Sequence, residues 1–233
     1  MISSATATLW STVKDGRTVN QDRAGASTDR FAIADGASDS ARAEVWAEIL
    51  VEAYVREHIE PWDTAELPRL RHRWRDEVHR PTLPWHSKQK LNLGGATTFL
   101  GVRLAPDHAC YDVTAIGDSC LFHFRREQLV AAGPVDGHGR FGRKPCTIRS
   151  RFDDPDVFRK SLWRFTIPYQ RGDVLILATD ALSKYLLRAH EQDRKVDMAE
   201  HLATEESFTR WVVDARAHDG LDNDDTTICV VRL

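Results

Sequence analysis

The sequence predicts one α+β domain spanning residues 1–233. Short β-prone runs lie near both ends of the chain and helical segments are grouped between them, which favours terminal strands that join one core. A chain of 233 residues is long enough for one large domain, and its apolar content of 42 % is ordinary for a globular protein.

The N-terminal part is predicted to form two strands and then an amphipathic helix. The first strand runs through SATATLWSTV to a turn at Lys14-Asp15-Gly16, and the second covers Arg30 to Asp35. The helix lies within residues 38–59, because apolar residues recur on one face that would pack on the core: Val45, Trp46, Ile49, Leu50, Ala53 and Tyr54. Its candidate N-caps are Ser38, Asp39 and Ser40. A more polar helix is expected within Thr64 to Val78.

The rest of the chain is predicted to be rich in strands. Short β-prone runs separated by turn residues indicate an antiparallel meander: ATTFLGVRLA, ACYDVTAIGD, SCLFHFRRE and QLVAAG. Pro134 to Asp156 is rich in Gly, Pro and charge, which is typical of a loop. SLWRFTIPY and DVLILATD follow as strands, helices are expected within residues 181–217, and TTICVVRL closes the chain as a strand.

Composition argues against several classes of protein. Net charge is −3 with mixed signs, so we expect no nucleic-acid partner and no membrane partner. No stretch approaches the roughly 18 apolar residues of a membrane-spanning helix, and the N-terminus lacks the pattern of a secretion signal. The cysteines form no C-x-x-C pair, as expected for reduced thiols in a cytoplasmic protein.

Three predicted strands each deliver an aspartate at or just beyond their end. FAIA runs into Asp35 and Gly36, VLILAT runs into Asp180, and the alternating run YDVTAIG ends at Asp118. Each aspartate alone has an ordinary explanation, since Asp-Gly often forms a turn and Asp180 could cap a helix. The acidic residues near the C-terminus, Asp222, Asp224 and Asp225, could form a solvated loop.

The combination of these aspartates favours a metal site. A carboxylate at the rim of an apolar core is costly, and several converging carboxylates repel one another unless a cation neutralises them. Ligand sets made only of oxygen atoms favour hard ions such as magnesium or manganese. Gly36 permits close approach of the backbone, so its carbonyl oxygen is a further candidate ligand.

The order of motifs resembles that of the metal-dependent type 2C serine/threonine protein phosphatases, and more their compact bacterial members than the longer eukaryotic ones. The motifs are RTVNQD (residues 17–22), FAIADG (31–36), GGATT (94–98), AIGDS (115–119), GDVLILATDAL (172–182) and DDTTICVV (224–231). None is specific alone, but their order and spacing cover nearly the whole chain. The resemblance implies a four-layer αββα sandwich of two mostly antiparallel β-sheets flanked by helices.

The resemblance also implies a site that holds two Mn²⁺ or Mg²⁺ ions. Asp35 matches the aspartate that bridges both ions, Gly36 matches the residue that offers its carbonyl, and Asp180 matches the late aspartate on the first ion. Asp224 matches the final aspartate because it lies three residues before Thr227. Asp222 is the competing choice, since an asparagine follows it.

The remaining matched residues lie around these ligands. Asp22 matches an acidic residue that usually acts on the metals through water, and Asp118 matches one that helps to hold a third, weaker ion. Arg17 lies five residues before Asp22, as does the family's phosphate-binding arginine. Its planar guanidinium suits two phosphate oxygens. Catalytic roles are therefore expected for Arg17, Asp22, Asp35, Asp180 and Asp224.

The sequence departs from the family pattern at several positions. Gln21 stands where many members have Glu, and Ala37 where eukaryotic members often carry a His proposed as a general acid. Many bacterial members also lack that His. The late Asp-Gly motif is Asp180-Ala181 here, and the segment corresponding to the flap, within Pro134 to Pro155, is short.

The implied activity is hydrolysis of phosphoserine and phosphothreonine by attack of a water that bridges the two metal ions. The expected partners are a phosphorylated protein substrate and a cognate Ser/Thr kinase, and the expected state is a monomer. A haloacid-dehalogenase-type phosphatase is disfavoured, because Ile33 stands where its D-x-D-G pattern needs the nucleophile. A weak or inactive type 2C-like regulatory binding module remains the alternative, and Gln21 and Ala37 are the features that favour it.

Overall fold

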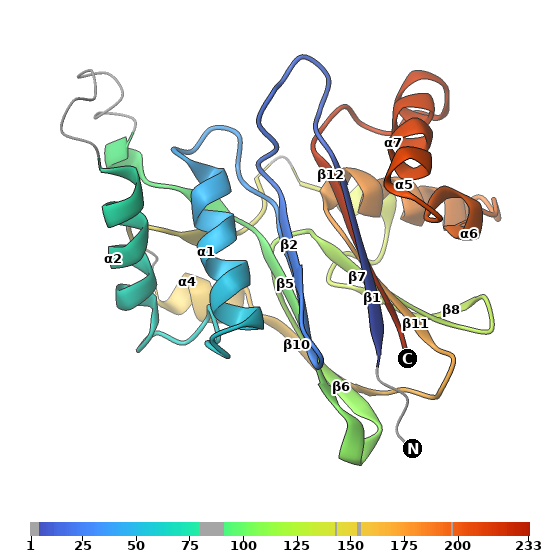
Figure 1. Ribbon diagram of the computed structural model, residues 1–233, viewed down its shortest axis with the longest axis horizontal. Helices are drawn as coiled ribbons and strands as arrows, with labels where there is room; N and C mark the ends of the chain where they lie inside the picture. Colours follow the sequence, from blue (N-terminus) through green and yellow to red (C-terminus); the bar gives the residue numbers. More distant parts are fainter. Residues whose placement is uncertain (1–4, 80–90, 143, 153–154, 197) are drawn as a thin grey trace.

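Two five-stranded sheets pack face to face, with helices on both outer sides (Figure 1). The computed structural model describes residues 5–79, 91–142, 144–152, 155–196 and 198–233. Helices α1 (Ala43–Val55) and α2 (Leu67–Val78) lie on one side, and α5 (Asp180–Glu191), α6 (Met198–His201) and α7 (Glu205–Asp214) lie on the other. This is the four-layer αββα sandwich that the sequence predicts.

The two sheets combine strands from distant parts of the chain. The first sheet has the order β1 (Thr6–Thr12), β12 (Thr226–Arg232), β11 (Val174–Ala178), β7 (Cys120–Arg125) and β8 (Gln128–Gly133). The second has the order β10 (Trp163–Pro168), β6 (Cys110–Ile116), β5 (Phe99–Ala105), β3 (Arg30–Ala34) and β2 (Arg23–Ala26). A short pair joins β4 (Ala96–Thr97) to β9 (Ile148–Arg149). All strand pairs are antiparallel.

The core between the sheets consists of alternate residues from facing strands. Phe31 and Ile33 of β3 are fully buried and belong to one cluster with Leu175 and Leu177 of β11. Successive side chains of a strand point to opposite faces, so Ala32 of β3 packs instead in the cluster under α1. Burial of each side chain of this size contributes on the order of 2 kcal/mol to the stability of the fold, so the ends of these strands are held firmly in position.

Helix α1 packs its apolar face on the second sheet, as its periodicity predicts. Trp46 is fully buried, and its indole N–H donates to the Ile148 carbonyl at 2.9 Å. The predicted N-cap is wrong, because the helix begins at Ala43 after Arg42, which has a left-handed backbone. Ser40 is not available as a cap, since its hydroxyl accepts the Ala96 N–H and donates to the Ala37 carbonyl.

Two further predictions about local structure are corrected. The meander is interrupted after β6, because β6 and β7 belong to different sheets and Asp118 lies in the crossover between them. The predicted loop Pro134 to Asp156 contains β9 and the start of α4 (Pro155–Lys160).

The strand β2 was not predicted, since RAGA has few β-prone residues. None of the helices in the described ranges is long and apolar enough to cross a membrane.

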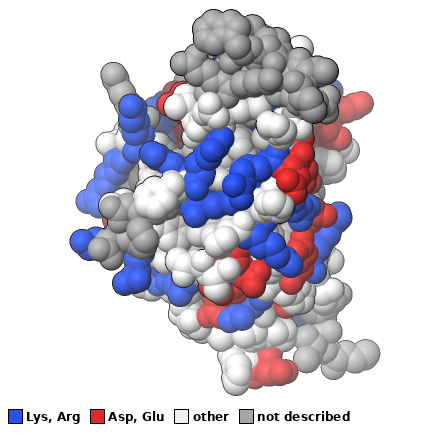
Figure 2. All heavy atoms as spheres, turned by 90° about the vertical axis from the view of Figure 1, so that its left-hand side faces the viewer, with Lys and Arg blue, Asp and Glu red and all other residues white. Residues whose placement is uncertain are grey.

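Basic side chains gather on the side of the molecule where α2 lies, with acidic side chains between them (Figure 2). Arginines of α2 account for part of this surface, and they form ion pairs with neighbouring glutamates. Arg69 pairs with Glu57 at 2.6 Å, and Arg73 pairs with Glu57 at 2.7 Å and with Glu77 at 3.3 Å. This face therefore carries mixed charge rather than a field of one sign.

Candidate active site

Asp35 and Gly36 follow β3 directly, and hydrogen bonds fix their backbone. The Thr98 N–H donates to the Asp35 carbonyl at 2.9 Å, and the Thr97 hydroxyl donates to the same oxygen at 2.7 Å. A Cβ atom on Gly36 would lie 2.6 Å from the Gln21 carbonyl oxygen. Only glycine therefore allows the segment that carries Asp22 to approach this strand end.

Asp22 lies where the two sheets meet. Its carboxylate is buried and accepts a hydrogen bond from the Thr179 hydroxyl at 2.9 Å. The same hydroxyl accepts the Thr227 N–H at 2.9 Å. Because Thr179 follows β11 and Thr227 lies in β12, Asp22 is attached to the ends of two strands of the opposite sheet.

Asp180 and Asp224 lie near this junction. Asp180 is the first residue of α5, and its Oδ1 accepts the N–H of Ala181. Asp224 precedes β12, and its Oδ1 accepts the Asp225 N–H at 2.9 Å and a hydrogen bond from the Lys14 ammonium at 2.8 Å.

Asp118 is placed by the crossover between the sheets. Gly117 has φ +106°, and a Cβ atom there would lie 2.5 Å from Thr98 Cγ2, so glycine is required for this turn. The Ser119 hydroxyl is 2.9 Å from the Thr98 hydroxyl. The segment that holds Asp35 and the segment that carries Asp118 are thus joined through Thr98.

The electrostatics show that the five carboxylates share one region. The pKa of Asp35 is raised well above its usual value, first by burial and then by the negative charges of Asp22, Asp180, Asp118 and Asp224. Burial is also the main reason that the pKa of Asp22 rises to about 8 and that of Asp118 to about 7. Burial and the Asp224 charge raise the pKa of Asp180 to about 6. We call Asp22, Asp35, Asp118, Asp180 and Asp224 the carboxylate cluster.

Two oxygens of the carboxylate cluster have no partner. Asp22 Oδ1 and Asp118 Oδ1 are buried without a hydrogen bond in the described structure. An unpartnered buried carboxylate oxygen is costly, and a cation removes that cost. In the conformations seen here, no three His, Cys, Asp or Glu side chains of the described residues form a closed metal-binding group. Two of the cluster carboxylates are turned to other donors, Asp224 to Lys14 and Asp180 to Ala181.

Comparisons with known proteins identify the architecture. No family model and no curated protein sequence matches the chain. Among solved structures, PppA, described as a key regulatory component of T6SS in Pseudomonas aeruginosa, matches with 17% identity and a TM-score of 0.64, over 99% of this chain and 98% of that one. The serine/threonine phosphatase PstP/Ppp of Mycobacterium tuberculosis matches with 17% identity and a TM-score of 0.62, over 99% of both chains. The catalytic domain of PstP in complex with 2 manganese ions matches with 17% identity and a TM-score of 0.60, over 98% of both chains.

The chain has the type 2C phosphatase fold. The resemblance predicted from the sequence is confirmed at the level of architecture over nearly the whole chain. At this identity the match concerns the fold, so the roles of individual residues stay predictions. Within the type 2C fold, the structure still distinguishes between the candidates that the sequence left open.

Asp224 and Asp222 have similarly exposed side chains, 46% and 52%, and differ in the groups that they act on. Asp222 is exposed, and its carboxylate pairs with Lys184 at 2.7 Å. Asp224 adds to the raised pKa values of both Asp35 and Asp180, and its effect on the pKa of Asp180 is larger than that of Asp222. The surroundings therefore favour Asp224 as the last ligand of a type 2C centre.

Arg17 and Ala37 lie close in sequence to members of the carboxylate cluster, and the structure gives the two residues different environments. Arg17 is exposed, and within the described ranges its guanidinium makes no recorded hydrogen bond or ion pair. Ala37 is held by its backbone, since its N–H donates to the Ala96 carbonyl at 2.9 Å. Arg17 is thus available for a ligand, while Ala37 contributes no side-chain proton donor. The predicted flap lies partly outside the described residues.

The sequence prediction missed two residues that form hydrogen bonds around the carboxylate cluster. Lys14 was read as a turn residue, yet its ammonium bonds to Asp224 and to the Ser38 hydroxyl, each at 2.8 Å. Asp225 was read as part of an acidic loop, yet it is buried and accepts the N–H groups of Lys14 and Gln21. Neither role has a local sequence signal, because each depends on contacts between residues about two hundred positions apart.

A cavity elsewhere on the molecule is unrelated to the carboxylate cluster. It has a volume of about 770 Å³ and lies between the end of α1 and the outer face of β6 and β10, with Trp62, Arg103 and Arg164 among its walls. None of the carboxylate-cluster residues lines it. The candidate site is therefore identified by the chemistry of its side chains and not by this cavity.

Proposed function

We propose that the protein is a metal-dependent phosphoprotein phosphatase that hydrolyses phosphoserine and phosphothreonine at the carboxylate cluster. The observation that carries this proposal is the convergence of five carboxylates near strand ends of both sheets, with raised pKa values for four of them and two buried oxygens without partners. This donor set is made only of oxygen, which fits Mn²⁺ or Mg²⁺. The solved structure of PstP with 2 manganese ions supports the same reading.

The proposed ligands are Asp35, Asp180, Asp224 and the carbonyl oxygen of Gly36, with Asp22 and Asp118 nearby. When bound, divalent cations supply an activated water and offset negative charge on the phosphoryl oxygens. Two ions at the centre and a weaker third at Asp118 stay part of the proposal, as do the phosphoprotein substrate and a cognate kinase.

The chain's own residues have separate tasks in this scheme. Arg17 is exposed and can bind two phosphate oxygens with its guanidinium, which orients the ester for in-line attack. Thr179 fixes the Asp22 carboxylate through its hydrogen bond at 2.9 Å. Ala37 offers no proton donor, so we expect the leaving oxygen to take its proton from water. Because Arg17 contacts phosphate before and during reaction, Arg17→Ala should mainly raise KM.

The test is phosphate release from p-nitrophenyl phosphate and from a phosphothreonine peptide, with Mn²⁺ or with EDTA. We expect activity only with metal, and its loss in Asp35→Asn but not in Asp222→Ala, which changes an exposed carboxylate of the same region. Full activity of the wild-type protein in excess EDTA would contradict the proposal.

A second candidate is a regulatory module that binds phosphoprotein without turnover. The ion pair between Lys14 and Asp224 favours it, because a lysine then occupies a carboxylate that metal would need. PppA, which shares the fold, is described as a regulatory component. Metal-independent binding of the phosphothreonine peptide, with no phosphate release at any Mn²⁺ concentration, would favour this candidate.

A further inference from the structure

We propose that Lys14 is a built-in counter-ion of the carboxylate cluster, with which a metal ion must compete for Asp224. The inference rests on the proposed function, because it assumes that the carboxylate cluster takes up divalent cations. It adds a residue outside the ligand set that sets how tightly the protein binds metal.

The backbone of Lys14 is held firmly next to Asp224. The buried Asp225 carboxylate accepts the Lys14 N–H on one oxygen at 2.8 Å. Its other oxygen accepts the Gln21 N–H at 2.7 Å, which fixes the carboxylate in place. Arg216 bridges the same two segments from the other side, through the Val13 carbonyl at 3.0 Å and the Asp224 carbonyl at 2.6 Å. Lys14 therefore reaches Asp224 from a fixed position.

The ammonium of Lys14 also has two partners that orient it. It lies 2.8 Å from Asp224 Oδ1 and 2.8 Å from the Ser38 hydroxyl. The Lys14 side chain is 15% exposed, compared with 40% for Lys184, while their partners Asp224 and Asp222 are similarly exposed, at 46% and 52%. The Lys14 charge is therefore screened less by water than that of an ordinary surface lysine.

The position of this charge makes it a competitor of metal. Of the residues that the structure describes, Lys14 is the one whose cationic group forms an ion pair with a member of the carboxylate cluster. Asp224 in turn acts on Asp180 and Asp35, so the ammonium offsets part of the repulsion among these carboxylates. A divalent cation on Asp224 would lie next to the ammonium, and like charges at that separation repel. A metal ion held through Oδ1, the oxygen that the ammonium contacts, therefore requires the ammonium to leave Asp224, and one held through Oδ2 is opposed by the ammonium charge.

The experiment measures Mn²⁺ binding by isothermal titration calorimetry on the full chain, with no substrate present. We expect Lys14→Met to lower the Kd for Mn²⁺ on the order of tenfold, because the competing charge is gone. We also expect a lower melting temperature of this variant without metal, since the carboxylate cluster has lost its counter-ion. Lys14→Gln, which keeps hydrogen-bonding ability without charge, should show the same tightening and serves if Lys14→Met folds poorly.

The matched control is Lys184→Met. It removes an equally short lysine–aspartate pair, 2.7 Å long, from the neighbouring but exposed Asp222. Its Kd for Mn²⁺ should equal that of the wild-type protein. If the wild-type protein binds Mn²⁺ and both Lys14 variants show an unchanged or higher Kd, this inference is overturned and the proposed function is not. Binding only by the Lys14 variants would support it strongly, and absence of Mn²⁺ binding in all proteins would overturn the proposed function as well.

Discussion

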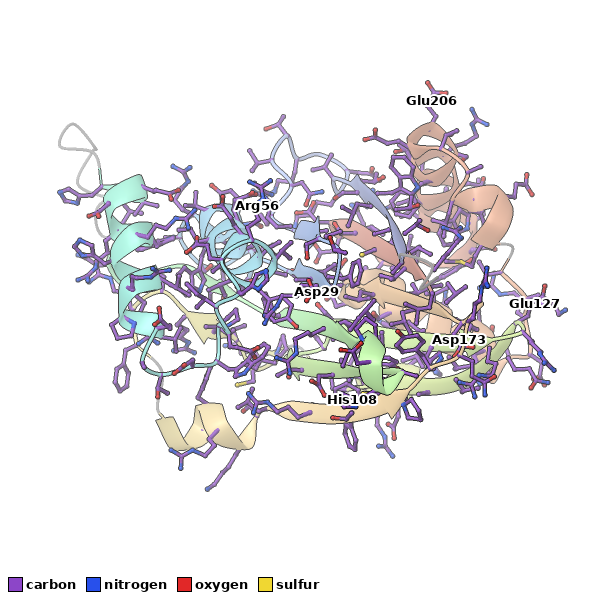
Figure 3. The ribbon with its side chains drawn as sticks, turned by 60° about the horizontal axis from the view of Figure 1, so that its bottom comes forward. Asp29, Arg56, His108, Glu127, Asp173 and Glu206 are labelled. Atoms are coloured by element: carbon purple, nitrogen blue, oxygen red, sulfur yellow. The ribbon has the colours of Figure 1, made fainter. Side chains whose placement is uncertain are left out.

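Strand β11 has an aspartate near each end, one buried (Asp173) and one partly buried (Asp180), and the two carboxylates have opposite surroundings. Asp173, labelled in Figure 3, precedes the strand and is fully partnered: His123 Nε2 lies 2.8 Å from it, Arg125 donates to both oxygens, and the Gln170 N–H donates at 2.8 Å. Burial alone would raise the pKa of Asp173, but these hydrogen bonds lower it to about 2. Asp180, after the strand, lies among other carboxylates, and its pKa rises to about 6.

The difference shows how to separate a structural acid from a functional one. A buried carboxylate with a full set of donors stabilises the fold in its ionised form. Buried carboxylates that face one another oppose folding unless a ligand neutralises them, and such groups mark functional sites. The two ends of β11 should therefore respond in opposite ways to the loss of a carboxylate.

The largest effect is expected for Asp35→Asn. Turnover of a phosphate ester should fall on the order of a thousandfold, because a shared ligand of the proposed metal ions is weakened. The free energy of unfolding without metal should stay the same or rise, since one repelling charge is removed. Steady-state kinetics in Mn²⁺ and urea unfolding in EDTA measure the two effects. A strong loss of stability with turnover unchanged would mean that Asp35 is structural.

Asp173→Ala should show the reverse pattern. Removing one partner of a buried ion pair costs about 3 kcal/mol of unfolding free energy, because His123 and Arg125 are left without it. Turnover at 25 °C should be unchanged, since Asp173 lies at the other end of β11. Asp112→Ala is the matched control, because its pair with Arg103 is exposed and worth at most about 1 kcal/mol. Urea unfolding compares the two variants.

The response to metal should distinguish Asp224 from Asp222. Ligand binding to the native state stabilises it by about 2.7 kcal/mol at a hundredfold excess over Kd. For a domain of this size that corresponds to roughly 2–4 °C of melting temperature per kcal/mol, so Mn²⁺ should raise Tm by several degrees. Asp224→Ala should lose most of this shift and Asp222→Ala should keep it. Equal losses of the Tm shift in both variants would mean that the assignment of Asp224 as the last ligand is wrong.

Acid should remove the contribution of Asp173. Because its pKa is lower in the folded protein than in the unfolded chain, its stabilisation is fully present above about pH 4 and is lost as pH falls towards about 2. The difference in unfolding free energy between the wild-type protein and Asp173→Asn should therefore shrink between pH 5 and pH 2.5, by roughly 1–2 kcal/mol. Urea titrations at both values test this, and a constant difference would contradict it.

The sequence predicted the fold well wherever a local pattern decides the structure. The apolar runs of β3 and β11 and the periodic face of α1 have strong local signals, and all three elements were predicted. The strands β6 and β7 were predicted as neighbours in one antiparallel meander, because short β-prone runs follow one another there. Which sheet a strand joins depends on contacts far along the chain, so no local pattern reveals that crossover.

The residues of the candidate site also divide into those with a local sequence signal and those that depend on distant contacts. Asp35, Asp118 and Asp180 could be named from the sequence because each lies at or just beyond the end of a predicted strand. Lys14 and Asp225 lie in loops, and their roles come from hydrogen bonds to each other and to distant residues. Residues that support a site through loop contacts therefore become visible only in three dimensions.

Anomalous diffraction from crystals of the protein soaked in Mn²⁺ tests directly whether the carboxylate cluster binds divalent cations through Asp35, Asp180 and Asp224. We predict an anomalous difference peak in contact with these carboxylates, with the Lys14 ammonium moved away from Asp224. A well-occupied peak at the exposed Asp222 loop, with none between Asp35, Asp180 and Asp224 at millimolar Mn²⁺, would contradict metal binding at the carboxylate cluster.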